Sequence, residues 1–298
     1  MVSEHATSRG GLVERAVTFG RMIKFSHSVF ALPFAIVSAI VVVHSTSITL
    51  TWVDAIFLLI CMVSARTAAM GFNRIVDRRI DAENPRTKNR ELPSGQIGAR
   101  EAWIFTGTAT LVFIAASFGI NVLCGILSVP LLALLYGYSL TKRYTWGAHF
   151  VLGACLGAAP IGVWFALTGS FDWAPVLLGL GVTLWTAGFD IYYSLQDEKF
   201  DRENGLKSFP ARFGTMRSIR TVRLIHLCAV AAYAGFGIVA GMSIPFWIGL
   251  VGITAILVYE AWLLRGGDLS RIDLAFFNLN GYVSILFAVA VSLDVWVF

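Results

Sequence analysis

The stretch NRIVDRRIDAENPRTKNRELPSG, residues 73–95, gathers six basic and four acidic side chains into 23 positions. It follows directly after residues 52–72, an apolar run long enough to cross a hydrocarbon core of roughly 30 Å. Charge placed at the end of a span indicates a helix that leaves the membrane and carries a polar face into a functional site. This junction therefore predicts both the class of fold and the place of the chemistry.

The composition of the whole chain agrees with a membrane protein. Of its 298 residues 57% are hydrophobic and only 14% are charged, and the mean hydropathy is +0.73, outside the range of ordinary soluble domains. We predict an all-α integral membrane protein with nine transmembrane helices in a bundle around a central cavity open to lipid. The nine apolar runs cover residues 28–44, 52–72, 103–120, 122–139, 149–168, 175–193, 222–241, 244–264 and 275–296.

The basic residues predict the orientation of these helices. Of the 23 lysines and arginines, 22 lie in the N-terminal segment or around the loops after the second, fourth, sixth and eighth runs. The positive-inside rule then places the N-terminus in the cytoplasm. We expect residues 1–27 to be a cytoplasmic segment and residues 28–298 a single transmembrane domain. The net charge of +5 indicates contact with membrane lipid rather than with nucleic acid, because no groove-reading or base-stacking module accompanies it.

A first acidic cluster lies within the opening stretch. Asn73, Asp77 and Asp81 are spaced four residues apart, so a helix that continues out of the span presents all three on one face. Two carboxylates one turn apart repel each other, and a cation between them relieves the repulsion. Oxygen ligands of this kind suit Mg²⁺ that bridges to a phosphate-bearing substrate. A solvated helix whose arginines pair with these acids is the alternative that this cluster alone leaves open.

A second acidic cluster, GFDIYYSLQDEKFDREN (residues 188–204), matches the first at an offset of 120 residues. Asp197 and Asp201 correspond to Asp77 and Asp81, and the flanking positions 199, 203 and 204 match as well. Asp190 stands two turns before Asp197 on the same predicted helix face. Because the two runs have the same orientation, we predict a parallel internal repeat that brings two acidic faces to one cavity.

Three further polar residues are candidates for substrate binding. Arg66 lies seven residues before Asn73, on the acidic face but inside the span, where an arginine is unfavourable unless it is paired. We expect it to bind either a substrate anion or a carboxylate such as Asp190. Tyr138 and Lys142 end the fourth run one turn apart and are suited to hold a diphosphate, although Lys142 also serves as an ordinary topology charge.

These parts together suit a substrate with a diphosphate head and a long apolar tail. Metal and basic side chains neutralise a leaving diphosphate in a site poor in water. The 22 Phe, 9 Trp and 8 Tyr of the chain offer aromatic faces that stabilise an allylic cation by about 2 kcal/mol when desolvated. The sequence thus favours transfer of a lipid tail to an acceptor that enters from the cytoplasmic side.

The two acidic clusters, with their continuations RTKNRELPSG and NGLKSFPARFG, resemble the motifs of the UbiA superfamily of intramembrane aromatic prenyltransferases. The resemblance extends over the whole chain and implies Mg²⁺-dependent transfer of a polyprenyl group from its diphosphate to an aromatic ring. It implies that the catalytic residues are Asp77, Asp81, Asp190, Asp197 and Asp201, all but Asp190 holding Mg²⁺. The substrate-binding residues would be Arg66, Asn73, Tyr138, Lys142 and Lys207.

Within that superfamily the sequence is similar to the 4-hydroxybenzoate polyprenyltransferase branch, particularly a bacterial subgroup of a menaquinone route. The acceptor implied is an aromatic acid, either 4-hydroxybenzoate or 1,4-dihydroxy-6-naphthoate, in ubiquinone or menaquinone biosynthesis. Both need a cationic site for a carboxylate and a flat apolar slot, so the residues leave the choice open. The resemblance also implies the bacterial cytoplasmic (inner) membrane, with the active site toward the cytoplasm.

A secondary transporter of an anionic substrate is the main alternative, since it would also explain an arginine inside a span. Transporter sites lie near the membrane midplane within inverted repeats, whereas these acids cluster at helix ends in a parallel repeat. Among other polar residues, we expect the isolated histidines to be interfacial or packed side chains without a catalytic role. They include His27, His44, His149 and His226.

Overall fold

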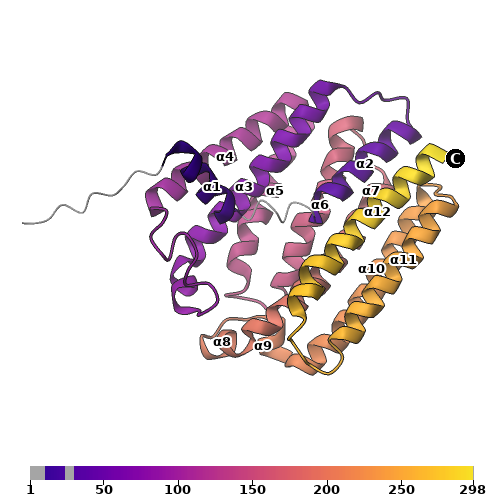
Figure 1. The fold of residues 1–298 in the computed structure, drawn as a ribbon. Helices are drawn as coiled ribbons and strands as arrows, with labels where there is room; N and C mark the ends of the chain where they lie inside the picture. Colours follow the sequence, from indigo (N-terminus) through magenta and orange to yellow (C-terminus); the bar gives the residue numbers. More distant parts are fainter. Residues whose placement is uncertain (1–10, 24–29, 298) are drawn as a thin grey trace, which may run out of the picture.

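The computed structural model describes residues 11–23 and 30–297, and every regular element within these ranges is helical (Figure 1). The elements are α1 (Leu12–Met22), α2 (Leu32–Ser45), α3 (Trp52–Glu83), α4 (Ala99–Ile120), α5 (Val122–Thr141), α6 (Ala148–Thr168), α7 (Trp173–Ser194), η2 (Leu195–Asp197), α8 (Glu198–Glu203), α9 (Phe209–Phe213), α10 (Thr215–Val239), α11 (Ile244–Leu263), η3 (Leu274–Leu279) and α12 (Asn280–Val297). The prediction of an all-α fold is therefore confirmed for the described residues.

Eight helical stretches in the described ranges are long and apolar enough to cross a membrane, and they correspond to the second to ninth predicted runs. The first predicted run, residues 28–44, begins in a part of the chain that the structure does not describe. His27 also lies outside the described residues. Its described portion is α2, an apolar helix of 14 residues, which extends about 21 Å and is shorter than a hydrocarbon core of roughly 30 Å. A ninth span stays a prediction.

The N-terminal segment packs against the charged junction. Met22 and Ile23, at the end of α1, are buried in a small cluster that also contains Ile75 of α3. The buried Arg74 donates a hydrogen bond from Nε to the carbonyl oxygen of Met22, at 3.1 Å. The part of residues 1–27 that the structure describes is therefore docked on the helix that carries the first acidic cluster.

The 32-residue helix α3 carries that cluster beyond the membrane. It begins at a capping box in which Thr51 and Asp54 satisfy each other's backbone N–H groups. At 1.5 Å per residue it extends about 48 Å, well over the thickness of a hydrocarbon core. The last turns of α3 therefore project past the apolar layer, and the acidic cluster lies on them.

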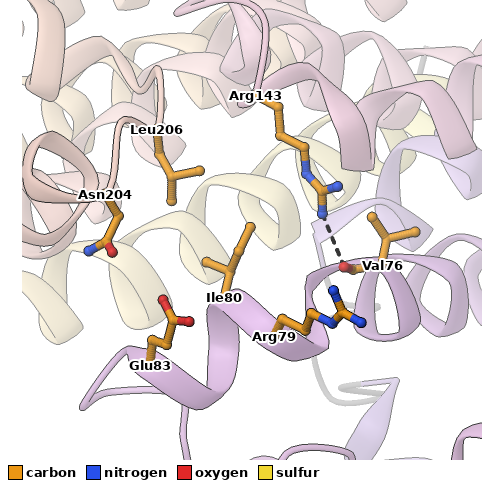
Figure 2. A pocket seen from close by; sticks show the side chains of 7 residues that line it. All are labelled: Val76, Arg79, Ile80, Glu83, Arg143, Asn204 and Leu206. Carbon is orange, nitrogen blue, oxygen red and sulfur yellow. Dashed lines mark hydrogen bonds between the residues drawn. The ribbon is translucent and has the colours of Figure 1, made fainter.

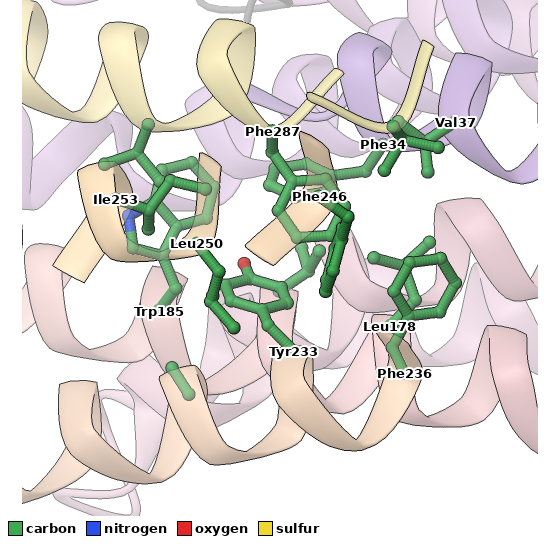
Figure 3. Packing of buried hydrophobic residues seen from close by; sticks show 14 of the residues in the cluster. Phe34, Val37, Leu178, Trp185, Tyr233, Phe236, Phe246, Leu250, Ile253 and Phe287 are labelled. Carbon is green, nitrogen blue, oxygen red and sulfur yellow. The ribbon is translucent and has the colours of Figure 1, made fainter. Parts of the chain in front are cut away.

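The largest apolar core lies where α2, α7, α10, α11 and α12 meet (Figures 1 and 3). Trp185 of α7 and Tyr233 of α10 are completely buried there. The ring of Phe287 lies 4.8 Å from that of Tyr233 and 5.1 Å from that of Phe34, between ring centroids. This aromatic packing fixes α7, the helix that leads into the second acidic cluster.

Helices α6 and α7 approach each other closely through glycines. A Cβ atom at Gly153 would lie 2.1 Å from the carbonyl oxygen of Thr183, and one at Gly157 would lie 2.3 Å from that of Gly179. Small residues at a helix interface allow the backbones to meet in a membrane, where association depends on packing. The contact between α6 and α7 therefore needs glycine at these positions.

The second acidic cluster does not continue α7 as a regular helix. The α-helix ends at Ser194, a 3-10 turn covers Leu195–Asp197, and α8 resumes for only six residues. The expectation of one regular α-helix from Asp190 to Asp201 is therefore wrong, while a shared face for Asp190, Asp197 and Asp201 stays a prediction. The repeat in sequence is built on an unbroken helix in one half and on a broken one in the other.

Candidate functional site

The first acidic cluster forms a single buried face on α3, as predicted. The Nδ2 atom of Asn73 donates a hydrogen bond to Asp77 Oδ2 at 3.1 Å, one helical turn away. Asp77 and Asp81 are only 2% and 4% exposed. Burial of charged carboxylates is unfavourable unless cations compensate them, so their partners define the site.

Asp77 is held by two cations from the end of α5. The distance from Lys142 Nζ to Asp77 Oδ2 is 3.0 Å, and Arg143 Nη2 lies 3.1 Å from Asp77 Oδ1. Tyr138 lies one turn before Lys142 at the end of α5, and its hydroxyl interacts electrostatically with the carboxylates of Asp190 and Asp77. The predicted pair Tyr138 and Lys142 is therefore brought to the first acidic cluster.

Asp81 is paired with a residue of the loop that follows α3. Arg90 Nη1 lies 2.7 Å from Asp81 Oδ1 and 2.9 Å from Oδ2. The hydroxyl of Thr87 also donates to the backbone carbonyl of Asp81, at 3.0 Å. The loop thus folds back onto the helix end from which it emerges.

The same loop reaches the second acidic cluster. Arg86 donates from Nε to Asp197 Oδ1 at 3.0 Å and from Nη2 to Asp197 Oδ2, and its third nitrogen donates to the hydroxyl of Tyr193 at 3.1 Å. Asn84 Nδ2 adds a hydrogen bond of 3.3 Å to Asp197. Burial alone lowers the pKa of Arg86, but its bonds with Asp197 outweigh burial and raise the pKa. The two clusters therefore meet.

Asp190 pairs with His149, a residue that we had expected only to pack. His149 is 5% exposed, its Nδ1 lies 2.6 Å from Asp190 Oδ2, and its Nε2 accepts a hydrogen bond of 3.3 Å from the backbone N–H of Phe209. Because Nε2 is an acceptor, the proton of the neutral ring belongs on Nδ1, which then donates to Asp190. His149 therefore orients the carboxylate.

Asp201 lies on α8, and the loop after α8 brings Lys207 to the end of α5. Burial raises the pKa of the Asp201 carboxyl, and the nearby negative charge of Asp197 raises it further, while Ser208 and Lys142 act in the opposite direction. Lys207 donates from its backbone N–H to the carbonyl of Lys142 at 2.7 Å and from Nζ to that of Tyr144 at 3.2 Å. Lys207 thus joins two loops of the site.

Arg66 lies on α3, about two turns deeper than Asn73, and is partly buried. Its depth agrees with the prediction of a cation inside the span. The carboxylate that was considered as its partner, Asp190, is bound by His149 through Oδ2. A role for Arg66 in binding a substrate anion stays a prediction.

The carboxylates do not form a ready-made metal cage. Among the described residues no group of three or more His, Cys, Asp and Glu side chains could hold a metal ion. Mg²⁺, however, is usually bound through one or two carboxylates together with substrate phosphates and water. The donors Asp77, Asp81, Asp197 and Asp201 fit that mode, in which the bound substrate completes the coordination.

A cavity of about 350 Å³ lies beside the first cluster, on the flank of α3 (Figure 2). Val76, Arg79, Ile80 and Glu83 line it from α3, and Arg143, Asn204 and Leu206 face them. Arg143 connects the wall of this cavity to the acidic face, since it donates hydrogen bonds to the carbonyl of Val76 at 3.0 Å and to Asp77 at 3.1 Å. The predicted central cavity open to lipid stays a prediction.

Sequence reasoning missed several residues that complete this site, among them Asn84, Arg86 and His149. Asn84 and Arg86 belong to the charged stretch 73–95, whose composition was the available signal. His149 had no comparable signal, because its partner Asp190 is 41 positions away. A lone histidine in an apolar run shows nothing of such a pairing.

Comparison with known proteins identifies relatives over most of the chain. A family model described as the UbiA prenyltransferase family matches residues 31–282. The 4-hydroxybenzoate octaprenyltransferase of Aliivibrio fischeri (strain MJ11) is 30% identical over 245 residues, which cover 82% of this chain and 84% of that protein. The protein of the same name from Pseudomonas aeruginosa (strain UCBPP-PA14) is 33% identical over 216 residues, 70% of each chain.

Solved structures show the same fold. The apo structure of a UbiA homolog from Aeropyrum pernix K1 has a TM-score of 0.81 and 29% sequence identity, and the match covers 90% of this chain and 98% of that one. A UbiA homolog from Archaeoglobus fulgidus bound to GPP and Mg²⁺ has a TM-score of 0.67 at 18% identity, over 94% and 99% of the two chains. The second likeness concerns the fold alone.

Proposed function

This chain belongs to the UbiA prenyltransferase family, and we propose that it transfers a polyprenyl group from a polyprenyl diphosphate to an aromatic acid. Family membership makes it an enzyme, a prenyltransferase, so the transporter alternative is set aside. The relatives named 4-hydroxybenzoate octaprenyltransferase support 4-hydroxybenzoate as the acceptor. The alternative acceptor, 1,4-dihydroxy-6-naphthoate, has the same carboxylate and hydroxyl chemistry and belongs to the same proposal.

The observation that carries this proposal is the bond between the two acidic clusters. Arg86 and Asn84 follow the first cluster in sequence, and both bind Asp197 of the second. Carboxylates from two repeats and the cations Lys142, Arg143, Arg86 and Arg90 therefore gather at one end of the bundle. Such a set of charges is suited to a diphosphate.

We assign Mg²⁺ binding to Asp77, Asp81, Asp197 and Asp201. When bound, the ion supplies positive charge that stabilises a leaving diphosphate. The basic side chains now paired with these aspartates are suited to bind phosphate oxygens. In the reaction the bond between the prenyl carbon and the diphosphate oxygen breaks, and the electron pair leaves with the diphosphate. The apolar spans around the site keep water from the allylic cation.

The acceptor ring then forms a carbon–carbon bond with the prenyl group and loses a proton. We assign that proton to Asp190, whose Oδ2 is held by His149 while Oδ1 makes no hydrogen bond within the described residues. Tyr138, near Asp77 and Asp190, is suited to contact the diphosphate. Arg66 and Asn73, on the same helix face, are assigned to the acceptor and its carboxylate.

The length and composition of the helices indicate a multi-pass membrane protein. We propose the bacterial cytoplasmic membrane, with the acidic clusters toward the cytoplasm, since the loops at that end carry nearly all the lysines and arginines. A reporter fused after residue 298 is expected to be active outside the cytoplasm. Activity of that reporter in the cytoplasm would contradict the orientation.

The test of the proposed function is an acceptor panel with purified enzyme. One polyprenyl diphosphate is supplied with 4-hydroxybenzoate, with 1,4-dihydroxy-6-naphthoate or with benzoate, which lacks a ring hydroxyl, and products are identified by mass spectrometry. We expect a prenylated product with a hydroxylated acid, its loss with EDTA and its recovery when excess Mg²⁺ is added. Absence of a prenylated product with both hydroxylated acids, or full activity in EDTA, would contradict the proposal.

A further inference from the structure

A groove on the outer surface of the bundle, between α10 and α11, lies away from the acidic clusters. In Figure 1 these two helices form the side of the bundle opposite α3 and α4. The groove has a volume of about 520 Å³. Its walls include Leu227 of α10 and Val258 of α11, which are 65% and 64% exposed and face the surroundings of the bundle. In a membrane these walls face lipid tails.

Two arginines line one end of this groove. Arg223 donates a hydrogen bond of 3.4 Å to the carbonyl of Ala261 and thereby joins α10 to α11. Arg265 follows the end of α11, and its guanidinium carbon lies 4.9 Å from the centre of the Trp262 ring. Tryptophan and arginine at the end of a span are typical of the membrane interface. The groove therefore runs from the interface into the apolar layer.

The positive charge at this rim has no carboxylate partner in the part of the chain that the structure describes. Neither Arg223 nor Arg265 forms a salt bridge with any residue that the structure describes. Of the acidic residues near Arg265 in sequence, Glu260 is 1% exposed and accepts a hydrogen bond from Asn280, and Asp268 lies in the exposed loop after α11. An anion from outside the protein is therefore the partner that the rim suits.

A polar group also lines the groove one turn below Arg223. His226 is 4% exposed, and neither ring nitrogen has a hydrogen-bond partner among the described residues. Its Nδ1 lies 3.7 Å from Glu260 Oε2, too far for a hydrogen bond. Both ring nitrogens are buried, and Nε2 lies against Gly188 of α7, so the imidazole closes the floor of the groove and offers no hydrogen bond to a ligand.

We propose that this groove binds an anionic phospholipid. The phosphate lies between Arg223 and Arg265, and an acyl chain runs along Leu227 and Val258. The apolar walls alone do not select a lipid, because any acyl chain fits them equally well. The selectivity comes from the two arginines, since basic pockets between spans bind acidic headgroups. The site is separate from the acidic clusters and does not depend on prenyl transfer.

The experiment is native mass spectrometry of the full-length protein in detergent, with equal amounts of phosphatidylglycerol and phosphatidylcholine. We expect wild type to retain phosphatidylglycerol about tenfold more strongly than phosphatidylcholine. Arg223→Gln/Arg265→Gln is expected to remove that preference. The control Arg220→Gln/Arg271→Gln removes the same charge from exposed positions that do not line the groove and is expected to keep it.

A second variant tests the groove without changing any charge. Leu227→Trp fills the groove and is expected to reduce retention of phosphatidylglycerol at least about threefold. Equal retention by wild type and Arg223→Gln/Arg265→Gln would overturn the proposal, and so would an equal loss in the control pair. Competition by sn-glycerol 3-phosphate as strong as that by the lipid would also overturn it, because the site would then bind a free phosphate.

Discussion

The two acidic clusters are matched in sequence but built differently. The first lies on an unbroken helix, where Asp77 and Asp81 are almost completely buried. The second follows the break between α7 and α8, and the side chain of Asp197 is 17% exposed. The comparison teaches that an internal repeat places equivalent side chains at one site without giving them equivalent surroundings. The burial and the partners of each aspartate, rather than its identity, then determine what each half of the repeat contributes to the site.

The largest effect is expected from removing one carboxylate in either half. Asp77→Asn and Asp197→Asn each keep the side-chain size and remove the negative charge that we assign to Mg²⁺ binding. We expect kcat/KM for prenyl transfer to fall at least about a hundredfold in both, since charge stabilisation at the leaving group is lost. Product formation followed by mass spectrometry measures this loss.

The matched control for these variants is Glu203→Gln. Glu203 ends α8, is exposed and lies 4.0 Å from Lys199 in an ordinary surface pair. We expect its activity to stay within about twofold of wild type. Near-normal turnover in Asp77→Asn or in Asp197→Asn would show that the acidic cluster with that residue does not take part in prenyl transfer. The internal repeat would then be a structural feature only.

A smaller effect is expected at His149, which has no counterpart in the first half. His149→Leu removes both the bond to Asp190 and the acceptor for the N–H of Phe209, and an unsatisfied buried group costs about 1–3 kcal/mol. We expect kcat to fall about tenfold with little change in KM for the prenyl donor. Steady-state kinetics in both substrates separates these parameters.

His149→Gln distinguishes orientation of Asp190 from simple packing. A glutamine amide can donate to Asp190 and accept from Phe209 at once, so we expect kcat within about threefold of wild type. Equal losses in His149→Leu and His149→Gln would mean that the imidazole fills space or acts in another way. The structure assigns His149 a positioning role because its two hydrogen bonds define one neutral tautomer.

The sequence predicted those parts of the site that depend on local spacing. Asn73, Asp77 and Asp81 repeat every four residues, and a helix necessarily brings such residues to one face. Apolar runs likewise predicted eight of the helical spans, because length and hydropathy alone decide whether a helix can cross a membrane. These predictions needed no knowledge of the partners of any residue.

The sequence did not predict the contacts made over long distances along the chain. Nothing in the six basic residues of stretch 73–95 indicates that Arg86 binds Asp197 while Arg90 binds Asp81. The 3-10 turn at Leu195–Asp197 contains neither glycine nor proline, so no local signal breaks the helix there. Both features follow from how the loops and helices pack around the site.

A third prediction contrasts the two arginines of that loop. Arg86 binds Asp197 with two nitrogens and Tyr193 with a third, whereas Arg90 binds Asp81 through Nη1 alone. A lysine reproduces a single-nitrogen contact but not a fork. We therefore expect Arg86→Lys to lower kcat/KM about fivefold and Arg90→Lys to lower it less than about twofold.

The same assay of prenyl transfer measures both lysine variants side by side, so each serves as the control for the other. Equal activities would show that only the positive charge at these positions matters. A larger loss in Arg90→Lys than in Arg86→Lys would reverse the comparison and make the bond within the first half, rather than the bond between the halves, the more important one.

The smallest effect on turnover is expected from the packing of α6 on α7, which places His149 against Asp190. In Gly153→Ala the new Cβ would lie 2.1 Å from the Thr183 carbonyl oxygen, a backbone atom that cannot move without shifting α7. We expect a loss of about 1–3 kcal/mol in stability, seen as a lower thermal transition in detergent, with turnover equal to that of wild type at a temperature where the variant is folded. Gly162→Ala is the control, because a Cβ at that position of α6 meets nothing within 4 Å. If both variants unfold at the wild-type temperature, then α6 and α7 tolerate separation, and the position of Asp190 must depend on its hydrogen bond with His149 more than on the helix contact.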